Sequence, residues 1–299
     1  MKKLLFLLIV LASSCSDGVK TLPSSTGALS EVIFVVDDIL WDESIKEIVV
    51  KTFAAPLLGL VQNESSFRVV QVNHIEFKSI LKTHKNIFII GKNLPNSNQQ
   101  DKWAKEQLVV QLNYENNKED NFKKDLNKIK AIFDWRELKS LRKEISKLSN
   151  QTAQENIKNN FNVEVLIPSE YKILKDTSTL FWATYNPDKE EVIKQLLVFS
   201  FIPKSANLQQ EVLQKTDSIL AQYLKGAKQE QYVKIESEFP PYYNNNIYKG
   251  IWKLEKGFMG GPFLAKTYFV GDKIIVSVGL VFDPNSRKRK HLKILEAIL

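Results

Sequence analysis

The stretch FLAKTYFVGDKIIVSVGLVF, residues 263–282, decides the fold class of this chain. It holds two apolar runs, 263–270 and 273–282, separated only by Gly271 and Asp272. Runs rich in β-branched and aromatic residues predict strands, whereas glycine and aspartate favour the turn between them. The end of the chain is therefore expected to contain a β-sheet.

The rest of the C-terminal half extends this sheet and adds two helices. Phe161, Val163, Val165 and Ile167 alternate strictly up to Pro168, which predicts a strand with one solvated face. Further strands are predicted over residues 180–185, 195–201, 232–238 and 248–255. Helices are predicted over residues 208–226 and from Pro284 to the last residue, because apolar residues recur there at helical spacing. This order predicts an α/β sandwich, similar to PsbP-like domains.

The N-terminal half predicts a second α/β unit. Residues 31–38 contain a continuous apolar run, which is typical of a central strand, and a helix follows until Pro56. Strands are predicted over residues 67–72, 86–90 and 108–112, and an amphipathic helical stretch over 116–158. We therefore expect an α+β chain with two mixed sheets and packed helices. Its domains are an N-terminal one over 31–158 with a helical connector and a C-terminal one over 159–299.

The first fifteen residues resemble a bacterial lipoprotein signal. Lys2 and Lys3 precede an apolar segment over residues 4–12, and two serines then lead to Cys15, the only cysteine of the chain. At 1.5 Å per residue such a segment is too short to cross a hydrocarbon core of about 30 Å. The pattern predicts a signal peptide over 1–14 and lipidation of Cys15; the alternative is a plain secretory signal, which would leave Cys15 as a free thiol.

Residues 15–30 are small, polar and interrupted by glycine and proline, which predicts a flexible tether behind the lipid. The anchor predicts a cell-envelope protein, in the outer membrane and facing the periplasm, with the lipid on Cys15 as its membrane contact. The formal charge of +8 indicates either a surface that attracts anionic partners or a surface that is simply rich in lysine. Nucleic acid is not expected as a partner in this compartment. A single cysteine leaves no disulfide to stabilise the fold.

A search for reaction chemistry finds no recognisable centre. His74, His84 and His291 are scattered, and the chain has no HExxH, GxSxG, Walker or GxGxxG motif. No catalytic residue, cofactor or metal site is therefore predicted, and an enzyme is the less favoured interpretation.

Three clusters are candidate binding sites. Asp37 and Asp38 end the first predicted strand, with Trp41 close behind; they could hold a cation or sugar hydroxyls, or simply cap the following helix. A glycine-rich loop between two predicted strands offers either a binding loop or a tight connection. Four cations at the start of the last helix oppose the helix dipole, so they suit anionic head groups or a solvated face. The members of the last two clusters are Gly257, Gly260 and Gly261, and Arg287, Lys288, Arg289 and Lys290.

Four segments resemble one known family. They are VVDDILW (35–41), FAAPLLGLVQNESSFRVVQV (53–72), GIWKLEKGFMGGPF (250–263) and FDPNSRKRKHLKILEAIL (282–299). Together they are similar to the lipoproteins of the Bacteroidota built on the domain of unknown function 4837. The resemblance implies a lipid-anchored envelope protein and brings no catalytic residues. In that phylum O-glycans attach to Asp-Ser/Thr-aliphatic triplets, and Asp217-Ser218-Ile219 matches, which makes Ser218 a candidate glycosylation site.

Three functions are consistent with these observations. The favoured one is a non-enzymatic binding or scaffold module for an envelope protein or glycan. The second is a glycan or peptidoglycan hydrolase that uses carboxylates near Asp37 and Asp38. The third is electrostatic docking of the basic cluster on anionic lipid.

Overall fold

The computed structural model describes residues 21–61, 63–115 and 118–299. The predicted signal peptide and Cys15 lie outside these residues. The described chain falls into two compact units. Among the described residues, unit 1 consists of 21–28, Val32–Glu43 and 70–115, whereas unit 2 consists of Leu29–Glu31, Ser44–Val69 without residue 62, and Lys118–Leu299.

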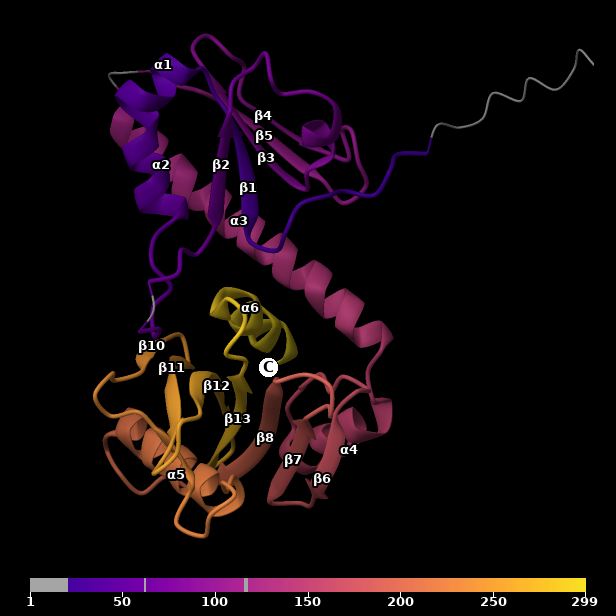
Figure 1. Cartoon of the computed structure of the whole chain (residues 1–299), viewed down its shortest axis with the longest axis vertical. Helices are drawn as coiled ribbons and strands as arrows, with labels where there is room; N and C mark the ends of the chain where they lie inside the picture. Colours follow the sequence, from indigo (N-terminus) through magenta and orange to yellow (C-terminus); the bar gives the residue numbers. More distant parts are fainter. Residues whose placement is uncertain (1–20, 62, 116–117) are drawn as a thin grey trace, which may run out of the picture. The chain divides into compact units, whose positions relative to one another are not determined.

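A five-stranded sheet forms the centre of unit 1 (Figure 1), in the order β2-β1-β3-β5-β4. β1, β3 and β5 are parallel, and β4 pairs antiparallel with β5 at the edge. The continuous apolar run of β1 is buried, as expected for a strand that is covered on both faces. The strands are β1 (Glu31–Val35), β2 (Arg68–Val72), β3 (Asn86–Gly91), β4 (Ser97–Gln100) and β5 (Leu108–Asn113).

An eight-stranded antiparallel sheet forms the centre of unit 2, in the order β10-β11-β12-β13-β8-β7-β6, with β9 paired to β11. The stretch 263–282 supplies most of β12 and β13, whose register closes at Val270 and Lys273. Gly271 lies in the turn with φ of +60°, a conformation that favours glycine. The strands are β6 (Lys172–Asp176), β7 (Leu180–Tyr185), β8 (Ile193–Phe201), β9 (Val233–Ile235), β10 (Tyr242–Asn244), β11 (Ile247–Leu254), β12 (Gly260–Val270) and β13 (Lys273–Phe282).

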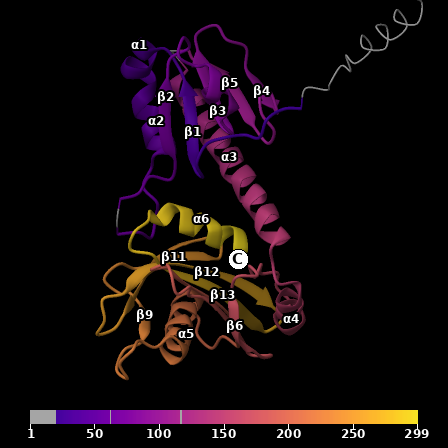
Figure 2. The ribbon, with the colours of Figure 1, turned by 45° about the vertical axis from the view of Figure 1, so that its right-hand side comes forward.

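Helices cover both faces of this sheet (Figure 2). α4 (Gln151–Phe161) and α6 (Lys288–Ile298) pack their apolar residues on one face. α5 (Leu208–Tyr223) packs on the other face. The remaining helical elements are α1 (Asp38–Leu40), η2 (Trp41–Ile45), α2 (Lys46–Phe53), η3 (Ser79–Thr83) and α3 (Glu119–Lys147).

The predicted class, an α+β chain with two sheets and packed helices, is confirmed by these elements. The likeness of the C-terminal half to PsbP-like domains stays a prediction. No helix among the described residues is both long enough and apolar enough to span a bilayer.

Three local expectations differ from the structure. The alternating segment 163–167 is not a strand: α4 continues to Phe161, and the segment that follows buries Val163, Val165 and Ile167 without a sheet partner. The long helical stretch is two helices, because Asn150 starts α4 by accepting a hydrogen bond from the Ala153 amide at 3.0 Å. Residues 21–28 of the expected tether belong to unit 1, where Thr26 bridges to His84.

Candidate functional site

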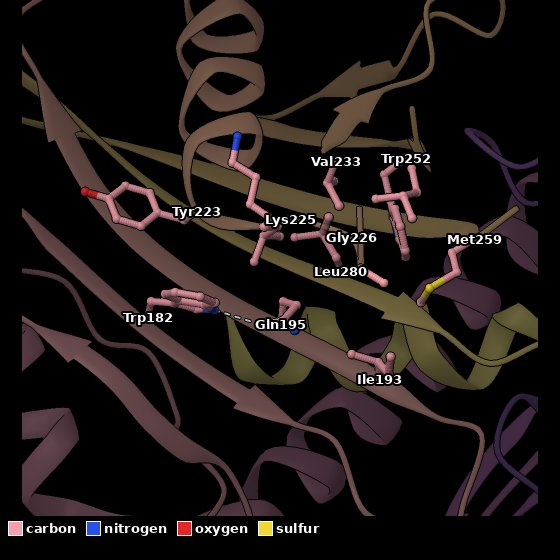
Figure 3. Close-up of a pocket in the computed structure, with 13 residues that line it drawn as sticks. Trp182, Ile193, Gln195, Tyr223, Lys225, Gly226, Val233, Trp252, Met259 and Leu280 are labelled. Atoms are coloured by element: carbon pink, nitrogen blue, oxygen red, sulfur yellow. Dashed lines mark hydrogen bonds between the residues drawn. The ribbon is translucent and has the colours of Figure 1, made fainter. Parts of the chain in front are cut away.

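A cavity of about 360 Å³ lies between the eight-stranded sheet and the chain that follows α5 (Figure 3). Most of the side chains around it are aliphatic or aromatic. The lining residues are Trp182, Ile193, Gln195, Tyr223, Leu224, Lys225, Gly226, Ala227, Val233, Trp252, Leu254, Met259 and Leu280.

The sheet supplies one wall through residues spaced two apart. Ile193 and Gln195 of β8 share one face of the sheet, as do Trp252 and Leu254 of β11, because strand side chains alternate between faces. The Trp252 indole N–H donates to the carbonyl of Val281 at 3.2 Å. Its hydrogen-bonding need is thereby met inside the sheet, and the cavity receives only the apolar ring.

The opposite wall is the end of α5 and the loop that returns to β9. Lys225 bridges to Tyr232, and the Val233 amide donates to the Leu224 carbonyl at 2.9 Å, so this loop is held by backbone bonds. Gly226 suits the loop because a Cβ there would lie 2.5 Å from the Gln231 side-chain oxygen. The wall is therefore a built element of the fold.

Two hydrogen bonds set the polar character of one end of the cavity. The Trp182 indole N–H donates to Oε1 of Gln195 at 2.8 Å (Figure 3). Lys175 Nζ donates to the Tyr223 hydroxyl at 3.0 Å and lies 4.8 Å from the centre of the Tyr223 ring. The Trp182 and Tyr223 rings meet edge to face at 6.0 Å. None of the thirteen lining residues is a carboxylate, histidine, cysteine, serine or threonine.

The glycine-rich loop touches this cavity through one residue, Met259. Its glycines serve close packing in the sheet. A Cβ on Gly261 would lie 2.1 Å from the Val281 carbonyl oxygen, and one on Gly260 would lie 2.9 Å from the Trp252 carbonyl oxygen. Gly257 lies against Leu254 in the turn between β11 and β12.

The acidic pair, Asp37 and Asp38, lies in unit 1, whereas every residue that lines the cavity belongs to unit 2. Asp38 accepts hydrogen bonds from the side-chain amides of Gln71 at 2.9 Å and Asn73 at 3.3 Å. Asp37 precedes α1 without a side-chain capping bond, and both aspartates are exposed. Trp41 is buried against Phe34, with ring centres 6.1 Å apart, so its role is in the core.

The basic cluster at α6 has partners within unit 2. Glu64 accepts the backbone N–H of Lys288 at 2.7 Å and that of Arg289 at 2.9 Å, so its carboxylate occupies the positive end of the helix dipole. The Arg289 guanidinium donates to the Ser65 carbonyl at 2.8 Å. Burial lowers the pKa of Arg289 below its usual range, and the nearby Arg287 adds to this effect. Arg287 and Lys290 remain exposed, so two of the four cations face solvent.

A Ser-His-Asp group just before and within α6 is not arranged as a catalytic triad. Ser286 Oγ lies 2.8 Å from Nε2 of His291, and Asp283 Oδ2 lies 2.9 Å from that same nitrogen. A triad needs one partner on each ring nitrogen. Burial lowers the pKa of His291, against the opposing effect of Asp283. Burial raises the pKa of Asp283, but hydrogen bonds from Ser286 and His291 more than offset it and leave that pKa below its usual value.

The other predicted positions have simpler outcomes. Ser218 is exposed on α5, next to Asp217, which accepts the Ile235 amide at 2.6 Å. The described ranges contain no group of three or more His, Cys, Asp or Glu side chains placed to hold a metal ion. Lipidation at Cys15 and glycosylation at Ser218 stay predictions.

Two family models match this chain. Residues 150–299 match the one described as Domain of unknown function (DUF4837), and residues 25–146 match Domain of unknown function (DUF8532). A comparison with curated proteins finds no match. Among solved structures, the chain is similar to the human StarD13 (DLC2) lipid transfer and protein localization domain, at 10% identity and a TM-score of 0.22, over 50% of this chain and 93% of that one. A likeness at this TM-score supports no inference about this protein.

Proposed function

This chain belongs to the family described as Domain of unknown function (DUF4837). Because that description names no activity, we propose the function of this chain from its own residues. It is a lipid-anchored protein of the bacterial cell envelope that binds a small, largely apolar molecule and leaves it chemically unchanged. The cavity beside α5 is the binding site.

The observation that carries this proposal is the combination of size and lining in one cavity. A volume of about 360 Å³ falls within the 300–1,000 Å³ typical of ligand pockets. At roughly 30 Å³ for each water-sized group, it accommodates about a dozen such groups. The tryptophan and aliphatic walls favour apolar atoms. The polar lining side chains are Gln195, Tyr223 and Lys225, and no carboxylate, histidine, serine or cysteine lines the cavity beside them, which favours retention of a ligand over its transformation.

The cavity can be tested with a neutral fluorescent probe, N-phenylnaphthylamine, whose emission rises in apolar surroundings. The protein carries Cys15→Ala and is expressed without residues 1–14, which removes both the lipid acceptor and the apolar segment and permits purification without detergent. We expect a saturable rise in emission. Ala227→Trp should abolish it by filling the cavity, whereas Ala206→Trp, on an exposed loop outside this cavity, should not. Equal binding by all three proteins, or by none, would contradict the proposal.

The cellular location is a separate part of the proposal and rests on the sequence of residues 1–15. We place the protein on the periplasmic face of the outer membrane of a member of the Bacteroidota. Metabolic labelling with an alkyne analogue of palmitate should mark the native protein and leave Cys15→Ala unmarked. Equal labelling of the two would contradict the assignment of Cys15 as the acylated residue.

A further inference from the structure

The polar side chains at the Trp182 end of the cavity keep hydrogen-bond donors that a ligand can use. The indole N–H of Trp182 can only donate, so its partner in Gln195 must be the carbonyl oxygen Oε1. The side-chain nitrogen Nε2 of Gln195 therefore keeps its two N–H groups. The partly buried Gln195 side chain lies on the cavity wall, as Figure 3 shows, so a ligand can receive these hydrogen bonds.

A second donor and a positive charge lie at the same end. Lys175 is the cross-strand neighbour of Trp182, so both side chains lie on the cavity face of the sheet. Lys175 Nζ donates to the Tyr223 hydroxyl oxygen, which leaves the hydroxyl proton of Tyr223 free to be donated outward. Among the described residues, no carboxylate pairs with Lys175 or with Lys225. This end of the cavity is thus positive and rich in donors.

The other end offers apolar atoms alone. Figure 3 shows Met259 and Trp252 on the side away from Trp182 and Tyr223. Leu254 and Leu280 complete this part of the lining, and the Trp252 N–H is already bonded to Val281. A molecule that satisfies both ends has an acceptor at one extremity and hydrocarbon over the rest.

We propose that the cavity binds an amphipathic carboxylate with a single hydrocarbon chain of medium length. Its carboxylate lies at Gln195, at the end of the cavity beside which Lys175 bonds Tyr223, and its chain runs toward Met259. A cavity for about a dozen water-sized groups matches the volume of one such chain. This inference rests on the proposed binding function, because it assigns the ligand class of the same cavity.

Three probes with one chain length and different head groups test the assignment: dodecanoate, dodecanol and dodecylamine. The assay measures displacement of N-phenylnaphthylamine from the Cys15→Ala protein, with dodecanoate and dodecylamine below their micellar concentrations and dodecanol below its solubility limit. A charge-assisted hydrogen bond should make dodecanoate bind about tenfold more tightly than dodecanol. Dodecylamine should bind most weakly.

Two substitutions identify the residues responsible. Gln195→Glu keeps an acceptor for the Trp182 N–H but replaces the free donor by a negative charge, so it should reverse the order of dodecanoate and dodecylamine. Lys175→Met should remove most of the preference for dodecanoate over dodecanol, whereas Lys172→Met, an exposed lysine of the same strand, should leave it unchanged. Thermal unfolding shows whether each variant is folded, and Lys175→Met alone decides the matter if Gln195→Glu is not.

The outcomes separate the two proposals. Equal affinity for dodecanoate and dodecanol, unchanged in Lys175→Met, would overturn the assignment of a carboxylate while leaving an apolar binding site in place. Failure of N-phenylnaphthylamine and all three probes to bind would overturn the proposed function itself.

Discussion

Glu64 is predicted to stabilise the C-terminal helix α6 from a distant part of the sequence. Its carboxylate accepts two backbone N–H groups of the first helical turn, at 2.7 and 2.9 Å, and Arg287 at the N-cap provides no side-chain cap. Loss of a capping acceptor costs about 1–2 kcal/mol, and loss of a negative charge at the helix dipole costs about 0.3–1 kcal/mol. Because Glu64 is partly exposed, we expect Glu64→Ala to lower the free energy of unfolding by about 2 kcal/mol.

Chemical denaturation with a helix-sensitive signal measures this change. In a unit of this size, about 2 kcal/mol corresponds to a fall in melting temperature of roughly 4–8 °C. Glu64→Gln should lie between the wild type and Glu64→Ala, because it keeps one acceptor and loses the charge. Glu155→Ala, which removes an exposed glutamate of α4, is the matched control. If Glu64→Ala and Glu155→Ala were equally stable, the capping role of Glu64 would be refuted.

Three further predictions follow from the same structure. Gly261→Ala should prevent correct folding or lower the free energy of unfolding by more than about 3 kcal/mol, because its Cβ would lie 2.1 Å from a carbonyl oxygen. Gly271→Ala, whose Cβ would meet nothing within 4 Å, should cost only about 1 kcal/mol of backbone strain. Urea unfolding of the two variants compares these costs. Burial lowers the pKa of His291 below its usual 6.5, so on acidification the unfolded state takes up the proton before the folded state does. The free energy of unfolding should therefore decrease as the pH is lowered past about 6.5. Unfolding measured at several pH values should show a weaker pH dependence in His291→Gln. Arg287→Gln combined with Lys290→Gln should leave the free energy of unfolding within about 0.5 kcal/mol of the wild type, because both side chains are exposed; a larger loss would show that these cations support the fold.

The strands and helices that the sequence predicted best have strong local patterns. The apolar run of β1 is buried as its composition indicated, and so are most of the apolar residues in the runs of β12 and β13, although Phe269 of β12 is exposed. β4 was not predicted because its sequence, SNQQ, is entirely polar and forms a strand only through its partner β5. In residues 163–167 the alternation predicted which side chains are buried, but periodicity alone does not reveal whether a neighbouring strand is available.

The candidate site was much harder to predict than the fold. Its residues come from β7, β8, β9, β11, β13, the end of α5 and the loops after α5 and before β12, so no local motif brings them together. Trp182 and Gln195 each lie in strands that were predicted, yet their hydrogen bond depends on the pairing of β7 with β8. The basic cluster was visible as a local motif, but its partner was not. Its four cations oppose the helix dipole, and Glu64, 224 residues before Lys288, supplies the compensating negative charge.

The most direct test of the central claim is a crystal structure of the Cys15→Ala protein with ω-bromododecanoate, in which anomalous scattering locates the bromine at the end of the chain. We expect a bromine peak between Met259 and Trp252, and density for the carboxylate within hydrogen-bonding distance of Gln195. An empty cavity in crystals whose protein binds the compound elsewhere would contradict the assignment of this cavity as the binding site.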